Sequence, residues 1–304
     1  MKLHNDRDNF EIAVRLTSRY FNVSMAIVEK DYYVTLFLKE LSKVVPNLVF
    51  KGGTSLSKCY KIIDRFSEDI DITLEQNSYT QGNKKKVKES VVKICKQLDF
   101  ELLNIEETRS RRDYNCYRID YGALYESSSL KPQLLLETVF MVKSYPIEIR
   151  KASSMIYDYF KIIENEEAIS HYELEPFIIK VQTLERTFID KIFAICDYMI
   201  GKNINGHSRH IYDISRLLNR IKLDDNLVLL INEVREDRKK NSRCYSAQDG
   251  IAISKLLKSI IDSNIYKEDY ETITEKLISK PIKYEEAIES LKTIIQSKIF
   301  EVNK

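Results

Sequence analysis

Residues 51–74 read KGGTSLSKCYKIIDRFSEDIDITL, and this stretch decides how the first half of the chain is interpreted. The chain has only seven glycines in 304 residues, yet Gly52 and Gly53 are adjacent here. The preceding LVF and the later DIDITL have the composition of short strands, whereas SLSKCYKII has helical apolar spacing. The stretch therefore predicts a buried strand, a glycine turn, a helix and a second strand.

A pair of aspartates, Asp69 and Asp71, lies on the second predicted strand with one residue between them. Side chains alternate between the two faces of a strand, so both carboxylates are expected to point the same way. A spacing of about 6–7 Å, from a rise of ~3.3 Å per residue, lets the two carboxylates hold a hard cation. Mg²⁺ commonly binds one or two carboxylates together with substrate phosphates. A solvated strand face is the simpler interpretation of such a pair taken alone.

A third carboxylate, Glu137, interrupts the otherwise apolar face that Leu135 and Val139 share on the predicted strand QLLLETVF. A charge on an apolar face needs a partner if it is buried. The partner could be a metal ion or a lysine, and the sequence leaves both open.

The glycine turn has the chemistry of a phosphate site. Gly52 and Gly53 let the backbone turn sharply and approach a phosphate closely, and Thr54 and Ser55 add hydroxyl donors. Main-chain N–H groups at the start of the following helix favour an anion. A phosphate site followed by carboxylates meets the needs of transfer from a nucleoside triphosphate. The GxxxxGK[ST] loop and the protein-kinase motifs are both missing.

The apolar periodicity predicts an α+β chain with two domains. Helices are expected over 8–22, 24–42 and 83–98, and strands over FELLNIEET (100–108), NCYRIDYGA (115–123), QLLLETVF (133–140) and YPIEIR (145–150). Beyond about residue 183, segments such as LERTFIDKIFAICDYMI and DNLVLLINEVREDRK are helical in pattern. We therefore expect a mixed-sheet core domain with N-terminal helices over 1–182 and a helical domain over 183–304.

The composition excludes several classes of protein. Hydrophobic residues make up 43% and charged residues 31%, which is typical of a globular chain and not of a disordered one. A run of 18 apolar residues and a signal peptide are both missing, so no membrane partner is expected. The five scattered cysteines indicate free thiols and a cytoplasmic location. The basic runs at 83–88, 109–112 and 237–243 are interpreted singly as solvated charge, because nucleic-acid binding needs such charges on one face.

The sequence GGTSLSK followed by RFSEDID resembles the nucleotidyltransferase signature of a Gly-Ser or Gly-Thr turn and an Asp-x-Asp pair. Within that superfamily it resembles the AbiEii/AbiGii toxin family of type IV abortive-infection toxin–antitoxin systems. LERTFIDKIFAI resembles the family's helical motif, with Glu185 and Lys191, and RHIYDISRL resembles its last motif, with Asp213. The resemblance extends from residue 51 to about residue 217. One departure is His210, which stands where members often have an acidic residue.

The resemblance implies a nucleotidyltransferase-like fold whose helical domain closes the nucleotide cleft, and a role for each matched residue. Asp69, Asp71 and Glu137 would bind Mg²⁺ (or Mn²⁺), and Glu137 would also act as base. Lys191 would contact the nucleotide phosphates, and Asp213 would orient Lys191 or the nucleotide. The expected nucleotide-binding residues are Gly52, Gly53, Thr54, Ser55, Lys58, Arg65 and Lys191.

The resemblance also implies an activity: transfer of a nucleoside monophosphate from an NTP to RNA, at the 3′ end of tRNA, with release of pyrophosphate. The expected outcome is growth arrest or abortive phage infection. The donor base stays open, with GTP among the candidates, and the cognate antitoxin encoded alongside need not bind the toxin. The basic stretches at 83–88 and 237–243 would suit an RNA acceptor. Two alternatives remain: transfer to a protein hydroxyl (AMPylation or UMPylation), and NTP binding without catalysis, which the complete carboxylate trio disfavours.

Overall fold

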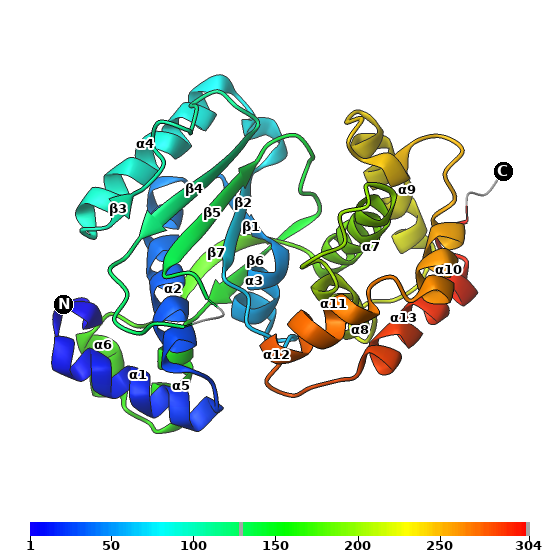
Figure 1. The fold of residues 1–304 in the computed structure, drawn as a ribbon. Helices are drawn as coiled ribbons and strands as arrows, with labels where there is room; N and C mark the ends of the chain where they lie inside the picture. The colour runs from blue at the N-terminus through cyan, green and yellow to red at the C-terminus, as the bar shows by residue number, and fades with distance from the viewer. Residues whose placement is uncertain (128–129, 302–304) are drawn as a thin grey trace. The chain divides into compact units, whose positions relative to one another are not determined.

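The computed structural model describes residues 1–127 and 130–301 (Figure 1). The chain divides into two compact units, and each is described here by itself. Unit 1 contains Met1–Lys61 and Phe66–Val181, and unit 2 contains Ile62–Arg65 and Gln182–Lys304. The chain therefore passes from one unit to the other three times, first within the stretch that joins the glycine turn to the aspartate pair.

Unit 1 is built on a mixed sheet whose described strands follow the order β3-β4-β5-β2-β1-β7-β6. Neighbouring strands are antiparallel at β3/β4, β4/β5 and β1/β2, and parallel at β2/β5 and β1/β7. This mixed pairing confirms the predicted α+β class. The strands are β1 Leu48–Lys51, β2 Asp69–Leu74, β3 Glu101–Leu102, β4 Tyr114–Asp120, β5 Gln133–Val139, β6 Ile147–Ala152 and β7 Phe177–Gln182.

The two long N-terminal helices of unit 1 begin at side-chain caps. The Asp6 side chain accepts from the backbone N–H of Asn9 at the start of α1, and Ser24 accepts from that of Ile27 at the start of α2. Asn22, with φ of 54°, ends α1, so the two predicted N-terminal helices are confirmed as separate. The helical segments are η1 Leu3–Asn5, α1 Arg7–Phe21, α2 Met25–Val44, α3 Gly52–Ser55, η2 Leu56–Tyr60, η3 Gln76–Ser78, α4 Gln81–Gln97, α5 Met155–Ile162 and α6 Glu166–His171.

The two faces of the sheet have different environments. One face belongs to the hydrophobic core of unit 1, where Ile70, Ile72, Leu134 and Leu136 are fully buried together with side chains of α2 and α4. The intervening residues are half-buried at Asp69 and Asp71 of β2 and along β5, whereas Thr73 of β2 is buried. The alternation along each strand therefore places the carboxylates of β2 and β5 on the face opposite to this core.

Unit 2 is helical, as predicted beyond residue 183. The short segment 62–65 also belongs to unit 2. It is held there by an isolated β-bridge between Arg65 and Ile278. None of the described helices combines the length and the apolar character that a membrane-spanning segment needs. The helical segments are α7 Leu184–Ile200, α8 Arg209–Leu218, α9 Asp225–Lys239, η4 Tyr245–Ala247, α10 Ile253–Ser263, α11 Lys267–Asp269, η5 Tyr270–Thr274, α12 Glu275–Leu277 and α13 Tyr284–Ser297.

Some predicted elements differ from the structure. The strand predicted over 100–108 is wrong beyond Leu102, because the side chain of Asn104 bonds to the carbonyl of Cys116 and the N–H of Arg118 and the chain turns away. The helix predicted for SLSKCYKII starts earlier, at Gly52, and ends at Tyr60 with Lys61 in the left-handed region. The sequence analysis did not predict β7, α5, α6 or α13.

Candidate active site

The glycine turn lies directly against one of the predicted carboxylates. Gly52 follows β1 with φ of +76°, a backbone conformation that residues with a side chain rarely adopt. A Cβ added at Gly52 would stand 2.0 Å from Oδ2 and 2.8 Å from Cγ of Asp71. Two independent constraints, the backbone angle and the close carboxylate, therefore require glycine at this position.

The strand register places the three predicted carboxylates on one face of the sheet. Asp71 pairs with Lys51 of β1 on one side and with Glu137 of β5 on the other, and Glu137 pairs in turn with Cys116 of β4. Paired residues on neighbouring strands point the same way, so these four side chains form a row. Asp69 lies two residues before Asp71 on the same half-buried face.

Tyr114 is a site residue that the sequence analysis missed. Its hydroxyl donates to Oε1 of Glu137 at 3.3 Å, and the residue is 44% exposed. Burial of the hydroxyl, followed by the charge of Glu137, raises the pKa of Tyr114 above its ordinary value, and Asp71 adds to the effect. The hydroxyl is therefore protonated at neutral pH and available as a donor. The one signal in the sequence was its position directly before the predicted strand NCYRIDYGA.

The thiol of Cys116 responds to the same accumulation of negative charge. Desolvation, with the carboxylates of Glu137 and Asp69, raises the pKa of Cys116 to about 11. The thiol is therefore neutral at physiological pH.

The side chains of the carboxylate face are of the type that binds a divalent cation. Carboxylate oxygens are the hard ligands that Mg²⁺ prefers, and Mg²⁺ needs only one or two of them beside substrate phosphates. Within the described residues, no group of three or more His, Cys, Asp or Glu side chains is gathered tightly enough to enclose a metal ion unaided. Asp69, Asp71 and Glu137 therefore offer a donor set on a common face that would be completed by the substrate.

The hydroxyls of Thr54 and Ser55, predicted as phosphate donors, form hydrogen bonds within unit 1. Both residues are buried. The Thr54 hydroxyl donates to the carbonyl oxygen of Asp69 at 2.5 Å and lies 3.0 Å from the hydroxyl of Ser67. The Ser55 hydroxyl donates to the carbonyl oxygen of Gly52 at 2.8 Å. The turn therefore offers its backbone, at Gly52 and Gly53, as the part that a triphosphate could approach.

Lys58 does not fit the predicted role of an additional phosphate contact. It is 2% exposed, and its ammonium group donates to Asp31 Oδ1 at 2.5 Å, to the Asp31 carbonyl at 3.1 Å and to the Thr35 hydroxyl at 2.6 Å. Its three donors are therefore used inside unit 1, where the ammonium group links η2 to α2.

Unit 2 contains a second group of predicted residues: Arg65, Lys191 and Asp213. The guanidinium of Arg65 donates to both carboxylate oxygens of Asp213, at 2.7 and 2.6 Å, and the ammonium group of Lys191 lies 2.6 Å from Oδ2. Burial alone would raise the pKa of Asp213, but Arg65 and Lys191 hold it well below its ordinary value. Asp213 therefore acts as the counterion of both cations, and Arg65, 4% exposed, does not fit the predicted phosphate contact.

His210, which departs from the family pattern, lies beside this group. Its Nδ1 is 3.4 Å from the ammonium nitrogen of Lys191. Desolvation, followed by the positive charges of Lys191 and Arg209, holds the pKa of His210 well below its ordinary value. The imidazole is therefore neutral at physiological pH, and it adds no positive charge to the two cations that share the Asp213 carboxylate.

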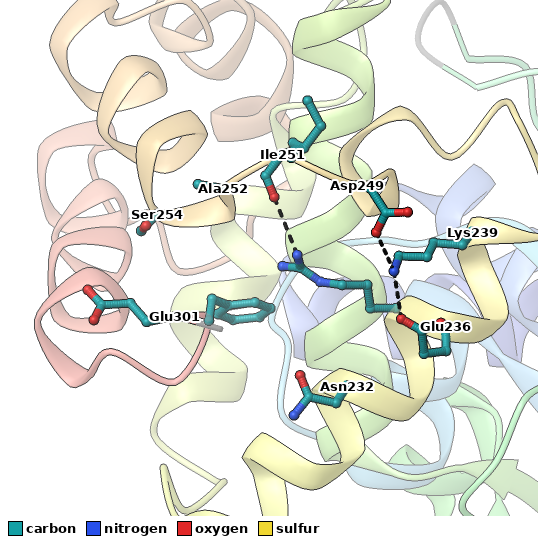
Figure 2. Close-up of a pocket in the computed structure, with 11 residues that line it drawn as sticks. Asn232, Glu236, Lys239, Asp249, Ile251, Ala252, Ser254 and Glu301 are labelled. Atoms are coloured by element: carbon teal, nitrogen blue, oxygen red, sulfur yellow. Dashed lines mark hydrogen bonds and ion pairs between the residues drawn. The ribbon is translucent and has the colours of Figure 1, made fainter. Parts of the chain in front are cut away.

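Figure 2 shows a pocket of about 620 Å³ in unit 2 that contains none of the predicted site residues. Lys239 lies on its wall and forms ion pairs with Glu236 and Asp249. Two further residues of the basic run 237–243 are also ion-paired. Arg238 pairs with Asp190 and Asp197, and Lys240 pairs with Asp237. These three residues are therefore ion-paired inside unit 2, whereas Arg243 of the same run is exposed.

The predicted site residues thus fall into two groups, one in each unit. Unit 1 brings together Gly52, Gly53, Asp69, Asp71 and Glu137, whereas unit 2 brings together Arg65, Lys191 and Asp213.

Comparisons with known proteins identify the family of the chain and a similar fold. The family model described as "Nucleotidyl transferase AbiEii toxin, Type IV TA system" matches residues 36–295. Among solved structures, the fold is similar to that of MenT4, a nucleotidyltransferase toxin from Mycobacterium tuberculosis H37Rv. The TM-score is 0.61 at 16% identity, over 95% of this chain and 90% of that chain. A search of curated proteins returned no match. Because the family model spans most of the chain, the chain belongs to the AbiEii family of nucleotidyltransferase toxins of type IV toxin–antitoxin systems.

Proposed function

We propose that this protein transfers a nucleoside monophosphate from an NTP to the 3′-terminal hydroxyl of an RNA acceptor, specifically tRNA, and releases pyrophosphate. The observation that carries the proposal is the in-register pair of Asp71 and Glu137 on neighbouring strands, with Asp69 on the same face. The Gly52 turn lies against the Asp71 carboxylate, so the phosphate cradle and the acidic face adjoin each other.

Each group on this face has a proposed role in the transfer. The backbone of Gly52 and Gly53 holds the triphosphate, and Asp69 and Asp71, with Glu137, hold Mg²⁺. When bound, the metal neutralises the charge of the triphosphate and orients it. Glu137 accepts the proton of the acceptor hydroxyl, whose oxygen forms a bond to the α-phosphorus as the bond to pyrophosphate breaks. Tyr114, which donates to Glu137, fixes the orientation of that carboxylate.

The group in unit 2 has a proposed positioning role. Asp213 pairs with both Arg65 and Lys191 and fixes the direction of the Lys191 ammonium group. In the cell, the proposed transfer acts on cytoplasmic tRNA, arrests growth and limits phage multiplication. A cognate antitoxin opposes it without a requirement for direct binding.

A transfer assay tests the proposal. The protein is incubated with Mg²⁺, total bacterial tRNA and each α-³²P-labelled NTP in turn, beside the Asp69→Asn/Asp71→Asn variant and an Asp99→Asn control. Asp99 is an exposed loop residue with φ of 57°, which asparagine tolerates. Label is expected in the tRNA band, and the double variant should lose at least about 100-fold, the upper range for mutations around a bound metal.

Other outcomes of the same assay would redirect the proposal. Label on protein in place of tRNA would identify a protein hydroxyl as the acceptor. Absence of pyrophosphate release with every NTP would favour a nucleotide-binding module without catalysis. Removal of metal with EDTA should abolish labelling, and separate additions of Mg²⁺ and Mn²⁺ would show which ion restores it.

A further inference from the structure

Two basic runs that are separate in the sequence lie side by side in unit 1. The first is on α4, and the second is the segment 108–112 that precedes β4. The ammonium group of Lys88 on α4 donates to the carbonyl oxygen of Thr108 at 2.8 Å, and Lys84 pairs with Asp113 at 2.5 Å. The side chain of Asn115 holds the backbone of Arg109 from the other side through two hydrogen bonds. The second run is therefore fixed against the lysine-rich helix.

A groove of about 370 Å³ separates the exposed face of α4 from this segment; it is lined by Lys88, Glu89, Val92, Lys93, Lys96 and Ser110. Lys93 and Lys96 are exposed on the helix, and Arg111 and Arg112 are exposed beside Ser110. Within the part of the chain that the structure describes, these four cations form no ion pair, in contrast to the neutralised Arg238, Lys239 and Lys240 of unit 2.

The charge of the chain is concentrated in this region. Residues 81–112 contain nine lysines and arginines against five aspartates and glutamates. The rest of the chain contains 39 basic and 41 acidic residues, so it is slightly acidic although the whole chain has a net charge of +2. A surface of this sign attracts a polyanion, and the attraction comes from one face and not from the molecule as a whole.

The segment that borders the groove at Ser110 continues directly into β4. From Arg112 the chain needs two residues, at most about 7 Å of backbone, to reach Tyr114 at the start of β4. Tyr114 is 44% exposed and its hydroxyl donates to Glu137. An exposed aromatic ring beside a row of cations is the combination on which nucleic-acid bases stack while their phosphates are neutralised.

We propose that the groove between α4 and residues 108–112 binds the RNA acceptor through its phosphates, and that Tyr114 stacks on a base near the acceptor's reactive end. This inference rests on the proposed function, which it extends by naming the surface that holds the acceptor. An anionic membrane is the competing partner, because Leu103 and Ile105, which are 44% and 40% exposed, lie in the same connection. The concave groove with dispersed cations favours a strand of phosphates over a flat lipid surface.

The test compares a Lys93→Gln/Lys96→Gln/Arg111→Gln variant with a Lys222→Gln/Lys255→Gln/Lys276→Gln control. The control residues are exposed lysines of unit 2 that form no ion pair within the described residues. Binding of fluorescein-labelled tRNA is measured by anisotropy between 50 and 200 mM NaCl. The groove variant should bind at least tenfold more weakly at the lowest salt. Its slope of log K against log salt should fall by about 2–3, at ~0.7–0.9 per lost phosphate contact. The NTP-induced shift in melting temperature should be unchanged.

The outcomes separate this inference from the proposed function. Equal tRNA affinities in the groove variant and the control would overturn the inference, as would failure of the wild type to bind tRNA. Binding to vesicles of phosphatidylcholine and phosphatidylglycerol that is lost in the groove variant, with tRNA binding retained, would assign the surface to membranes and overturn it as well. Groove-dependent tRNA binding without nucleotide transfer would support the inference and contradict the proposed function. Nucleotide transfer to tRNA at the wild-type rate in the groove variant would support the proposed function and contradict the inference.

Discussion

At the scale of single residues, Gly52 has the least freedom of any position in the glycine turn. Its positive φ and the carboxylate of Asp71 both act against any side chain at this position. The two constraints have different consequences: the first concerns the path of the backbone, and the second concerns the position of a predicted metal ligand.

Gly52→Ala should therefore reduce both stability and transfer. We expect at least about 1–3 kcal/mol of destabilisation from the strained backbone, and a loss of transfer because Asp71 must move away from the added methyl group. Urea unfolding and the labelling assay measure the two effects. Gly82→Ala on α4 is the matched control, since the nearest atom to its added Cβ is 3.9 Å away. For this variant we expect the free energy of unfolding to increase by about 0.4–1 kcal/mol. Wild-type transfer in Gly52→Ala would contradict the assignment of Asp71.

Asp213→Asn should be among the most destabilising isosteric changes in unit 2. It leaves the buried charges of Arg65 and Lys191 without their carboxylate, at a cost of about 3–5 kcal/mol. Asp262→Asn, which breaks an exposed ion pair with Lys258, should cost no more than about 0.5 kcal/mol. Comparable unfolding midpoints for the two variants in urea would argue against the paired state of Asp213.

The same carboxyl predicts a pH dependence. Since the pKa of Asp213 is depressed in the folded state, its contribution to stability is complete above the unfolded pKa of about 3.9 and is lost as the pH falls toward the folded value. The wild type should therefore lose stability on acidification below about pH 4 more steeply than Asp213→Asn does. Parallel curves of unfolding free energy against pH for the two proteins would contradict this.

The residue scale also shows where prediction from sequence ends. The alternation of a strand was enough to place Asp69 and Asp71 on one face. The directions of Lys58 and Arg65 depended on partners that are remote in the sequence, Asp31 and Asp213. From the sequence alone, a basic residue near a glycine turn is interpreted as a phosphate ligand, because the distant carboxylate that binds it cannot be identified.

At the scale of secondary-structure elements, the hydroxyl of Thr54 joins α3 to the first residue of β2. It donates to the Asp69 carbonyl and lies beside the Ser67 hydroxyl. This contact fixes how the glycine turn stands relative to the aspartate pair, so it should affect the proposed site although Thr54 is buried.

Thr54→Val keeps the shape of the side chain but removes the donor. We expect a loss of about 1–3 kcal/mol, the cost of a buried acceptor that loses its partner, together with slower transfer. Thr54→Ser retains the hydroxyl, so its free energy of unfolding should fall by only about 0.8 kcal/mol for the missing carbon. Its transfer rate should be close to that of the wild type. Unfolding curves and transfer rates of the pair test this, and equal behaviour of valine and serine would show that the hydroxyl contributes nothing.

Elements were predictable where the signal was local. The apolar spacing alone located the first two helices closely, and the structure adds the side-chain caps of Asp6 and Ser24. The strand β7 was missed because FIIKVQ is a short apolar run whose partner, β1, lies more than 120 residues earlier in the chain. The predicted strand after Phe100 was wrong because the Asn104 side chain takes over hydrogen bonds that a neighbouring backbone would make.

At the scale of the whole molecule, the passage of segment 62–65 into unit 2 means that neither unit is a continuous piece of chain. A chain divided between Gln182 and Thr183 should therefore give two fragments that co-elute in size-exclusion chromatography after co-expression, because the first fragment carries Arg65 and the second carries Asp213. Arg65→Met should weaken this association at least tenfold, which a loss of about 1.4 kcal/mol would produce. Fragments that elute separately from the outset would contradict it.

The same feature has a consequence for synthesis on the ribosome. Arg65 lies 148 residues before Asp213 in the chain, and Ile278, its bridge partner, is further still. A nascent chain that ends before residue 213 already contains the glycine turn and all three carboxylates, but the segment between the turn and the aspartate pair has none of its anchors in unit 2. Truncated translation products would therefore carry the acidic face without the support that the finished protein gives it, so the order of translation itself delays assembly of this toxin until its chain is nearly complete.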